Sequence, residues 1–419
     1  MMKFGGTSVA DADRLKNAAR TIVAKRERGY AVVAVLSARG KETDRLIADA
    51  LEVSAQPDPR EMDMLLSTGE RVSCALCAMA VRDLGHQAIS LTGSQAGIVT
   101  DTSHTKARIL DVRADRIREA LAEDKIVLVA GFQGVSTARD VTTLGRGGSD
   151  TTAVALAAAI GAEECEIYTD VPGVFSADPR IVPDARKLDF VSFDEMLEMS
   201  ASGAGVLQLR SIEYARNHGV RVHCRSSFDH RDGTRVVSEE EAKEHPMENP
   251  LITAVTHSRG EARVTLVDVP DNPGIAGRVT TALADAGINI DMIIQSEPRS
   301  AGGRAELSFT IPGDETAAAD RALRPVCEEL GIDVTTDAGM GKVSIVGAGM
   351  KSHPGVAAKV FTVLGEAGIN IEMISTSTIR ISCVVAAGHV DAAVRALHEA
   401  FGLAGEGTIL VEDPFTSGP

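Results

Sequence analysis

The chain has 419 residues, 44% of them hydrophobic, so it is long enough for two or three domains with sizeable cores. Its formal net charge of −16 at pH 7 argues against a nucleic-acid partner, because phosphate backbones are bound by basic surfaces. The same charge makes anionic membranes unattractive, and we expect no apolar run as long as a membrane span, roughly 20 residues.

The cysteine pattern and the first residues are typical of a protein of the cytoplasm. Of the six cysteines, only Cys74 and Cys77 are close in sequence, and a zinc site would need a second pair at suitable spacing. We therefore predict no metal site, and we expect both cysteines in a protein core in a reducing cytoplasm. The segment Met1–Gly6 lacks the apolar stretch of a secretory signal.

Residues 1–238 alternate apolar, strand-like runs with helical patterns. The predicted strands are Ala31–Ser37, Ala88–Leu91, Ile126–Ala130, Glu166–Thr169 and Val220–Cys224. The predicted helices are Asp11–Glu27, Glu61–Leu84 and Thr151–Ile160. Such alternation is typical of βα units, so we predict an α/β domain with a largely parallel sheet between layers of helices.

A linker and a pair of repeats follow this domain. The linker is predicted at Glu239–Pro250, which is charged and then contains proline. After it, Asn272–Ser296 and His353–Ser377 align without gaps and are identical at more than half of their positions. Each copy contains a Pro-Gly turn, an amphipathic helix, a glycine that ends the helix and the start of a strand. Two copies are too few for a solenoid, so we predict a pseudo-symmetric pair of small α+β modules.

Three glycine-containing segments carry residues suited to binding phosphate or carboxylate groups. They are Lys3–Ser8, Thr143–Asp150 and Thr169–Arg180. Glycines let the backbone approach an anion closely, and a helix N-terminus offers free N–H groups. The first segment also fits plain helix capping, and the third also fits an ordinary loop. Neither GxGxxG nor the P-loop pattern is present, which disfavours a Rossmann dehydrogenase and a P-loop NTPase.

Five motifs in this order resemble aspartate kinases, most closely the monofunctional actinobacterial type. They are KFGGTS (Lys3–Ser8), STGER (Ser67–Arg71), TTLGRGGSDTTA (Thr142–Ala153), YTDVPGVFSADPR (Tyr168–Arg180) and the tandem GIN repeats. The resemblance covers nearly the whole chain. It implies an amino-acid-kinase fold at 1–238, which is an α/β/α sandwich around a mostly parallel, eight-stranded sheet. It also implies two ferredoxin-like ACT modules at 251–336 and 337–419, with a terminal strand that can return to the first module.

The resemblance implies roles for individual residues. The implied catalytic residues are Lys3, Arg146 and Asp150. Aspartate binding is implied for Thr43, Glu70, Arg146 and Gly147. Nucleotide binding is implied for Lys3, Gly5, Gly6, Thr169, Asp170, Phe175 and Arg180. Effector binding in the ACT modules is implied for Asp271, Asn289, Asn370 and Ile371.

The sequence departs from the family pattern at three places. Only Met1 and Met2 precede Lys3, so the first strand is expected to be clipped unless the native chain starts earlier. Phe175 stands where a tyrosine is common, which removes a hydroxyl but keeps an aromatic ring. Gly205 stands where the family usually has a lysine near the ATP phosphates, so we expect weaker nucleotide binding or weaker stabilisation of transition-state charge.

The implied reaction transfers the γ-phosphoryl group of ATP, bound with Mg²⁺, to the side-chain carboxylate of L-aspartate. The product is 4-phospho-L-aspartate, at the first step of lysine, threonine and methionine biosynthesis. Lysine, threonine or both are the implied effectors. The resemblance also implies a homo-oligomer held together by the ACT modules, in which a shorter subunit equal to the C-terminal half can take part.

Other readings remain open at this point. Kinases of glutamate, N-acetylglutamate or UMP share the fold, but they do not normally carry paired C-terminal sensor modules. A fused homoserine dehydrogenase would need a further domain with its own dinucleotide motif, which the sequence lacks. A catalytically weak amino-acid sensor would agree with Gly205 and the short N-terminus, whereas the retained Lys3, Glu70, Arg146 and Asp150 favour the enzyme.

Overall fold

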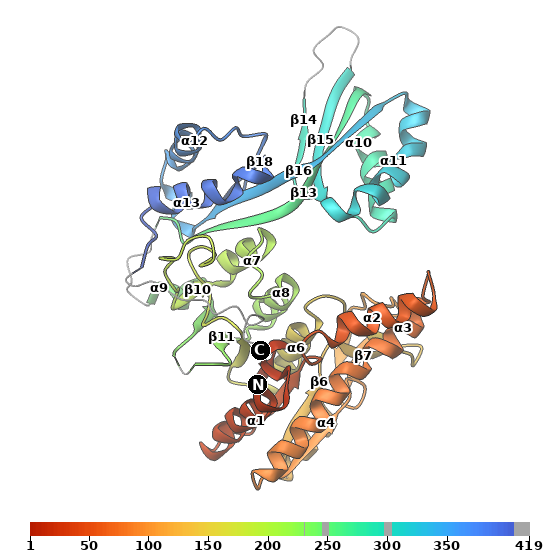
Figure 1. The fold of residues 1–419 in the computed structure, drawn as a ribbon, viewed down its shortest axis with the longest axis vertical. Coiled ribbons are helices and arrows are strands. Elements are labelled where there is room, and N and C mark those ends of the chain that lie inside the picture. Colours follow the sequence, from red (N-terminus) through yellow and green to blue (C-terminus); the bar gives the residue numbers. More distant parts are fainter. Residues whose placement is uncertain (230, 245–250, 297–303, 406–419) are drawn as a thin grey trace.

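The structure is a computed structural model that describes residues 1–229, 231–244, 251–296 and 304–405. It places an N-terminal α/β domain beside a C-terminal unit built on two very long strands (Figure 1). Four short 3-10 turns interrupt the loops, at Thr7–Val9, Gly313–Glu315, Ala348–Ser352 and Ala387–His389.

The N-terminal domain is built on an eight-stranded sheet, as the family resemblance implied. Its strands lie in the order β10 (Phe190–Ser192), β12 (Thr234–Val237), β11 (Val222–Ser226), β9 (Cys165–Thr169), β1 (Met2–Phe4), β2 (Val33–Leu36), β6 (Ile126–Ala130) and β3 (Ala88–Leu91). All neighbours are parallel except β11 and β12. Each of the five predicted strand runs contributes a strand to this sheet, which confirms the α/β prediction.

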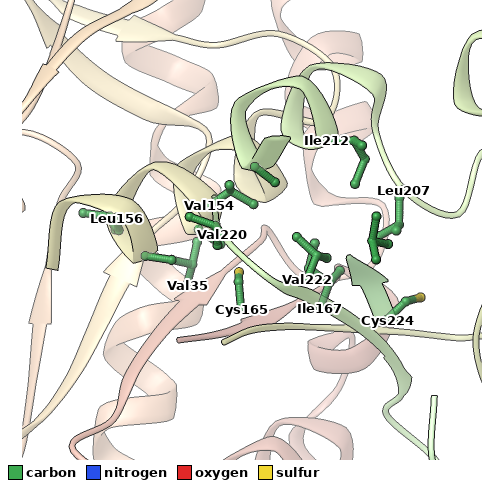
Figure 2. Packing of buried hydrophobic residues seen from close by; sticks show 14 of the residues in the cluster. Val35, Val154, Leu156, Cys165, Ile167, Leu207, Ile212, Val220, Val222 and Cys224 are labelled. Atoms are coloured by element: carbon green, nitrogen blue, oxygen red, sulfur yellow. The ribbon is translucent and has the colours of Figure 1, made fainter. Parts of the chain in front are cut away.

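Helices cover both faces of this sheet, because its strands are apolar on both sides. One face packs on α1 (Ala12–Glu27) and α4 (Thr68–Asp83). The other packs on α5 (Asp115–Ala122), α6 (Gly148–Ile160), α7 (Phe193–Ala201) and α8 (Leu209–His218). Figure 2 shows this second layer, where Val35 and Val222 of the sheet lie below Val154 and Ile212 of the helices.

The predicted helix Glu61–Leu84 is in fact two helices, α3 (Pro59–Leu66) and α4, which meet at Ser67. By length and composition alone, Pro59–Asp83 would suffice to cross a membrane, so the expectation that no apolar run is that long was wrong. The structure accounts for its apolar character, since Cys74 and Cys77 are buried in the core beneath α1. The core position predicted for these two cysteines is confirmed.

A second, four-stranded sheet lies beyond the main one, and the sequence patterns did not predict it. Its order is β5 (Ile109–Val112), β4 (Ile98–Thr100), β7 (Gln133–Ser136) and β8 (Val141–Thr143). Helix α3 packs against β8 and is joined to α2 (Glu42–Val53). Because β8 leads directly into the glycine-rich loop before α6, this small sheet supports that loop.

The C-terminal unit is one six-stranded sheet shared by both repeats. Its order is β14 (Ile293–Gln295), β15 (Arg304–Pro312), β13 (Ala254–Pro270), β16 (Asp333–Val346), β18 (Arg380–Ala386) and β17 (Met373–Thr376). The helices α10 (Ile275–Asp285) and α11 (Thr316–Leu330) lie at one end, and α12 (Val356–Glu366) and α13 (Val390–Ala400) lie at the other (Figure 1). The prediction that the two repeats associate within one chain is confirmed.

The strand pairing divides the two modules differently from the predicted boundaries. The first part of β13, Ala254–Arg259, pairs with Gly341–Val346, next to β18 of the second module. The second part, from Glu261 onward, pairs with β15 of the first module. The first module is therefore inserted into the second, whose fourth strand comes from the start of the C-terminal unit. Residues 406–419, which contain the expected terminal strand, lie outside the described part of the chain.

The segment predicted as a linker begins with a short helix, α9 (Glu239–Glu244). Its remaining residues, 245–250, lie outside the described part of the chain.

Candidate active site

The glycine pair after β1 is packed closely against two neighbouring loops. The backbone N–H of Gly5 donates to the carbonyl oxygen of Tyr168 at 3.1 Å, at the end of β9. A Cβ atom on Gly6 would lie 2.9 Å from the carbonyl oxygen of Ala38, which follows β2. The loop therefore sits at the carboxyl ends of the central parallel strands, where ligands bind in open α/β sheets.

Lys3 and Asp150 form a buried ion pair beside this loop. The Nζ atom of Lys3 lies 2.5 Å from Oδ1 of Asp150, and their side chains are 11% and 9% exposed. Asp150 is in the first turn of α6, where the helix dipole favours negative charge. The structure thus brings together two predicted catalytic residues that are 147 positions apart in sequence.

Arg146 extends from the loop between β8 and α6. Gly145 and Gly147 on either side of it have φ angles of 76° and 72°, a left-handed conformation that favours glycine. A Cβ atom on Gly147 would lie 2.3 Å from Cγ of Gln208, so this position has no room for a side chain. Arg146 is exposed, and among the described residues no ion pair holds its guanidinium group.

A buried carboxylate that the sequence patterns did not identify, Asp63 of α3, anchors this loop. Its oxygens accept hydrogen bonds from the Thr143 hydroxyl at 2.5 Å and from the Thr105 backbone N–H at 3.1 Å. The His104 ring contacts it at 2.7 Å. Asp63 is completely buried, but α3 also carries the charged residues Arg60 and Glu61, so no local sequence signal distinguishes Asp63 from a surface residue.

Glu70 lies at the start of α4, facing the loop after β2. Its Oε1 atom accepts a hydrogen bond from the Ala38 backbone N–H at 3.2 Å, while Oε2 is buried without a hydrogen-bond partner among the described residues. Burial raises the pKa of Glu70 to about 7. Thr43, the other predicted aspartate-binding residue outside the glycine loop, is half-buried in the first turn of α2.

A cavity of about 640 Å³ opens at the end of β9, and all four predicted nucleotide contacts of the third motif line it: Thr169, Asp170, Phe175 and Arg180. The predicted contacts Lys3, Gly5 and Gly6 are not among its lining residues. Gly205 lines it as well. The Arg180 side chain is 78% exposed and pairs with Asp178 at 2.7 Å. The Phe175 side chain also packs against buried residues of the second module, so this aromatic residue joins the cavity to the C-terminal unit.

One wall of this cavity comes from the C-terminal unit, which the sequence patterns did not indicate. Val255, Thr256 and His257 of β13 line it together with the end of α7. The two parts are in close contact, since a Cβ atom on Gly203 would lie only 1.9 Å from the carbonyl oxygen of His257. The backbone N–H of Val255 also donates to the carbonyl oxygen of Ser176 at 2.7 Å.

A second cavity, of about 470 Å³, lies in the first module at the start of α10. The predicted effector residue Asp271 lines it, together with Asn272, Gly274 and Gln295. Gly274 precedes the helix with a φ angle of 97°, and the first helical residues, Ile275 and Ala276, line the cavity.

The other predicted effector residues lie outside the lining of this cavity. Asn289 is exposed after α10. Asn370 donates to Glu372 at 2.7 Å, and Glu372 pairs with Arg263 of β13 at 2.9 Å. Ile371 packs against the core of the second module. The structure therefore places Asn370 at the junction of the two modules.

A third cluster of ionisable groups lies at the opposite end of the main sheet. Glu164, Glu166 and His223 offer ligand atoms within 4.8 Å of one another. However, Glu166 already pairs with Lys25 at 2.8 Å and with Arg225 at 2.9 Å. Because two cations already neutralise this carboxylate, the cluster is better described as an ion-pair network than as a metal site.

Comparison with known families agrees with this division of the chain. The amino acid kinase family model matches residues 1–226, which is more than half of the chain. ACT domain models match residues 263–328 and 343–401.

The chain is also similar to individual proteins over nearly its whole length. The aspartokinase of Mycobacterium tuberculosis is 54% identical over 408 residues, covering 97% of this chain and 96% of the relative. Escherichia coli aspartokinase III in complex with aspartate and ADP has a TM-score of 0.80 at 26% identity, covering 95% of this chain and 98% of that chain. Its complex with lysine and aspartate has a TM-score of 0.71 at 27% identity, over 96% and 98%. These matches support the kinase reading over the amino-acid sensor, and the chain belongs to the aspartokinase family of phosphotransferases.

Proposed function

We propose that this enzyme transfers the γ-phosphoryl group of ATP to the side-chain carboxylate of L-aspartate, giving 4-phospho-L-aspartate. The observation that supports this most directly is the buried Lys3–Asp150 ion pair, which joins the segment of the glycine pair to the first turn of α6, directly after the loop of Arg146. Aspartate and ADP are the ligands of the similar E. coli structure, which supports this choice of substrates.

The chemistry demands positioning and neutralisation of charge rather than a general base. The acceptor carboxylate is already an anion at pH 7, so the barrier arises mainly from its repulsion by the triphosphate. Lys3 is held in place by Asp150, and its ammonium group is directed to stabilise charge on the transferring phosphoryl group. The backbone at Gly5 and Gly6 allows phosphate oxygens to approach closely.

Aspartate is held by groups on one loop and at the starts of two helices, α2 and α4. Arg146 carries an exposed guanidinium group suited to a bidentate grip on the substrate α-carboxylate. Glu70 and Thr43 are placed to receive the remaining polar groups, with the substrate ammonium next to Glu70. An ammonium group there would favour the ionised form of Glu70, offsetting the burial that raises its pKa to about 7.

ATP occupies the cavity at the end of β9, with Mg²⁺ entering as part of the nucleotide substrate. Asp170 lines this cavity as an exposed carboxylate, whereas Asp178 is already paired with Arg180. Oxygen ligands of this kind suit Mg²⁺, which is usually held by one or two carboxylates and the phosphates.

The decisive experiment is an assay of ADP production by the purified full-length chain with L-aspartate, L-glutamate and N-acetylglutamate. We expect turnover only with aspartate, and we expect Lys3→Ala to lower kcat more than a hundredfold. Arg146→Lys should mainly raise KM for aspartate, because an ammonium group lacks the planar fork of guanidinium. Lys16→Ala, which removes an exposed cation of α1, is the matched control, and its kcat and its KM for aspartate should equal those of wild type.

A folded Lys3→Ala variant that keeps more than about a tenth of wild-type kcat would refute the role of Lys3, since that loss is only ~1.4 kcal/mol. Wild-type protein that produces no aspartate-dependent ADP would refute the proposed activity itself.

We also propose feedback control through the C-terminal unit, by lysine, threonine or both, in a cytoplasmic homo-oligomer. The 470 Å³ cavity combines Asp271, for an effector ammonium group, with a helix N-terminus, for its carboxylate. The lysine complex of the similar E. coli enzyme supports an amino acid as the effector. Ile293 and Ile374 occupy corresponding positions on the two edge strands and are 56% and 43% exposed, which fits association with a second subunit.

A further inference from the structure

The wall that β13 contributes to the nucleotide cavity contains a hydroxyl group without a partner. Thr256 lines the cavity and is only 5% exposed. Its Oγ1 atom is buried, and it has no hydrogen-bond partner among the described residues. A buried hydroxyl without a partner is costly, so such a group in a cavity wall indicates a ligand that satisfies it.

Strand alternation shows which way this hydroxyl faces. Side chains two positions apart on a strand share one face, so Thr256 lies on the same face as Ala254. Ala254 packs against the core of the catalytic domain, in the cluster that includes Met199 and Val206. Those two residues line the nucleotide cavity too. Thr256 is therefore directed toward the catalytic domain, on the side where the nucleotide is proposed to bind.

Two hydroxyl groups next to Thr256, those of Thr253 and Ser344, are satisfied within the protein. Thr253 Oγ1 donates to Glu195 at 2.7 Å. Ser344, which pairs with Thr256 across the two strands, shares a hydrogen bond with Ser382 at 2.7 Å. Of these three hydroxyl groups, only that of Thr256 lacks a partner among the described residues, and Thr256 is the one that lines the cavity.

We propose that Thr256 hydrogen-bonds to the edge of the purine base of the bound nucleotide and thereby contributes to nucleotide specificity. This inference rests on the proposed function, because it takes ATP as the ligand of the cavity. The lining contributed by the catalytic domain next to Thr256 includes the apolar Met199 and Val206, which suit the flat faces of a base. A threonine hydroxyl both donates and accepts, so it matches the polar edge of a purine. A residue of the regulatory unit then takes part directly in substrate binding.

The test compares Thr256→Val, which keeps the shape of the side chain but removes the hydroxyl, with Thr256→Ser, which keeps the hydroxyl. In steady-state assays of the full-length enzyme, we expect Thr256→Val to raise KM for ATP about threefold to tenfold, the range for loss of one hydrogen bond. KM for aspartate should not change, and Thr256→Ser should stay within about twofold of wild type. The preference for ATP over GTP, as a ratio of kcat/KM values, should fall in Thr256→Val by the same factor.

The control variant is Ser344→Ala, which removes a hydroxyl from the paired position of the neighbouring strand. It should leave KM for ATP unchanged, whereas an equal rise would mean that only the packing of the sheet matters and would overturn the proposal. An unchanged KM for ATP in a folded Thr256→Val variant would overturn it as well. A rise that is equal for ATP and GTP would refute contact with the base. Failure of the proposed function is distinguishable, because wild-type protein would then show no aspartate-dependent use of ATP.

Discussion

Gly205 is the residue whose replacement should increase activity. It lines the nucleotide cavity, and a Cβ atom there would have no neighbour within 4 Å. Its φ angle is also outside the left-handed region, so a longer side chain is compatible with the backbone. We therefore expect Gly205→Lys to lower KM for ATP about threefold to thirtyfold, as expected for a partly screened ion pair of ~0.7–2 kcal/mol with the triphosphate. Steady-state kinetics at varied ATP concentration measure this effect.

Two control variants separate the effect of charge from that of size. Gly205→Met adds a side chain of similar length without charge and should not lower KM for ATP. Gly388→Lys adds the same charge at another open glycine, on a turn of the C-terminal unit, and should leave KM unchanged. If Gly205→Lys is stable and its KM for ATP equals that of wild type, another cation has taken over the role.

Sequence motifs could predict those functional residues that lie within a recognisable local pattern of residue types. Lys3 and Asp150 stand in glycine-rich segments at helix starts, and the fold brings them into contact. Asp63 and Thr256 lack such a pattern, since their importance arises from what packs around them. An aspartate in a helix that carries other charged residues and a threonine in a strand look ordinary in sequence. Only tertiary structure shows that one anchors a loop and that the other faces a cavity.

At the scale of elements, the active-site loop depends on the joint between α3 and β8. Asp63 accepts hydrogen bonds from Thr143, at the start of the loop that carries Arg146, and from Thr105, in the β4–β5 segment that packs against Gly145 of that loop. We expect Asp63→Asn to raise KM for aspartate several-fold while leaving KM for ATP unchanged, because the nucleotide cavity lies at other strand ends. Loss of a charged, buried acceptor should also lower the free energy of unfolding by about 1–3 kcal/mol.

The matched control for this prediction is Asp140→Asn, because Asp140 also joins the β7–β8 hairpin to α3. It pairs with Arg60 at 2.9 Å, but both side chains are substantially exposed, so its loss should cost less than about 1 kcal/mol. Thermal melting measures the loss of stability, and steady-state kinetics measure KM for aspartate and for ATP. If the Asp63→Asn variant melts at a lower temperature but its KM for aspartate is unchanged, Asp63 stabilises the fold without positioning the loop of Arg146.

Elements were predictable where hydrophobic periodicity was long and strong. The continuous apolar run of β6 matches its predicted bounds, because a strand buried on both faces has no polar interruption. The bounds of β3 match as well, although this edge strand is only partly buried. The four-stranded sheet β5–β4–β7–β8 was missed, since its strands have only three or four residues. The partition of the modules was missed for a different reason: the passage of β13 from one module to the other is marked by Gly260, with a φ angle of 81° at a break in the strand register, and one glycine does not reveal which strands pair.

At the scale of the whole molecule, β13 connects the two proposed ligand sites directly. Near its start, Val255–His257 form a wall of the nucleotide cavity. At its end, Val269 and Pro270 line the effector cavity, and Asp271 follows immediately. An extended strand rises about 3.3 Å per residue, so the two cavities are joined by roughly 40 Å of continuous backbone. A shift of this strand at one end therefore acts on the wall of the other site.

This connection predicts that the effector acts on nucleotide binding. Any ligand that favours one position of β13 changes the affinity of the other site, and the coupling must be reciprocal in binding free energy. We expect an inhibitory effector, tested as lysine and as threonine, to raise KM for ATP by about fivefold or more, while ATP analogues weaken effector binding by the same factor. Asp271→Ala should abolish both effects, whereas Asp285→Ala, an exposed carboxylate at the other end of α10, should retain them. Isothermal titration of the effector into the full-length enzyme, with and without a non-hydrolysable ATP analogue, measures the factor by which the nucleotide weakens effector binding. An effector that binds with the same affinity in both titrations would show that β13 does not couple the two sites.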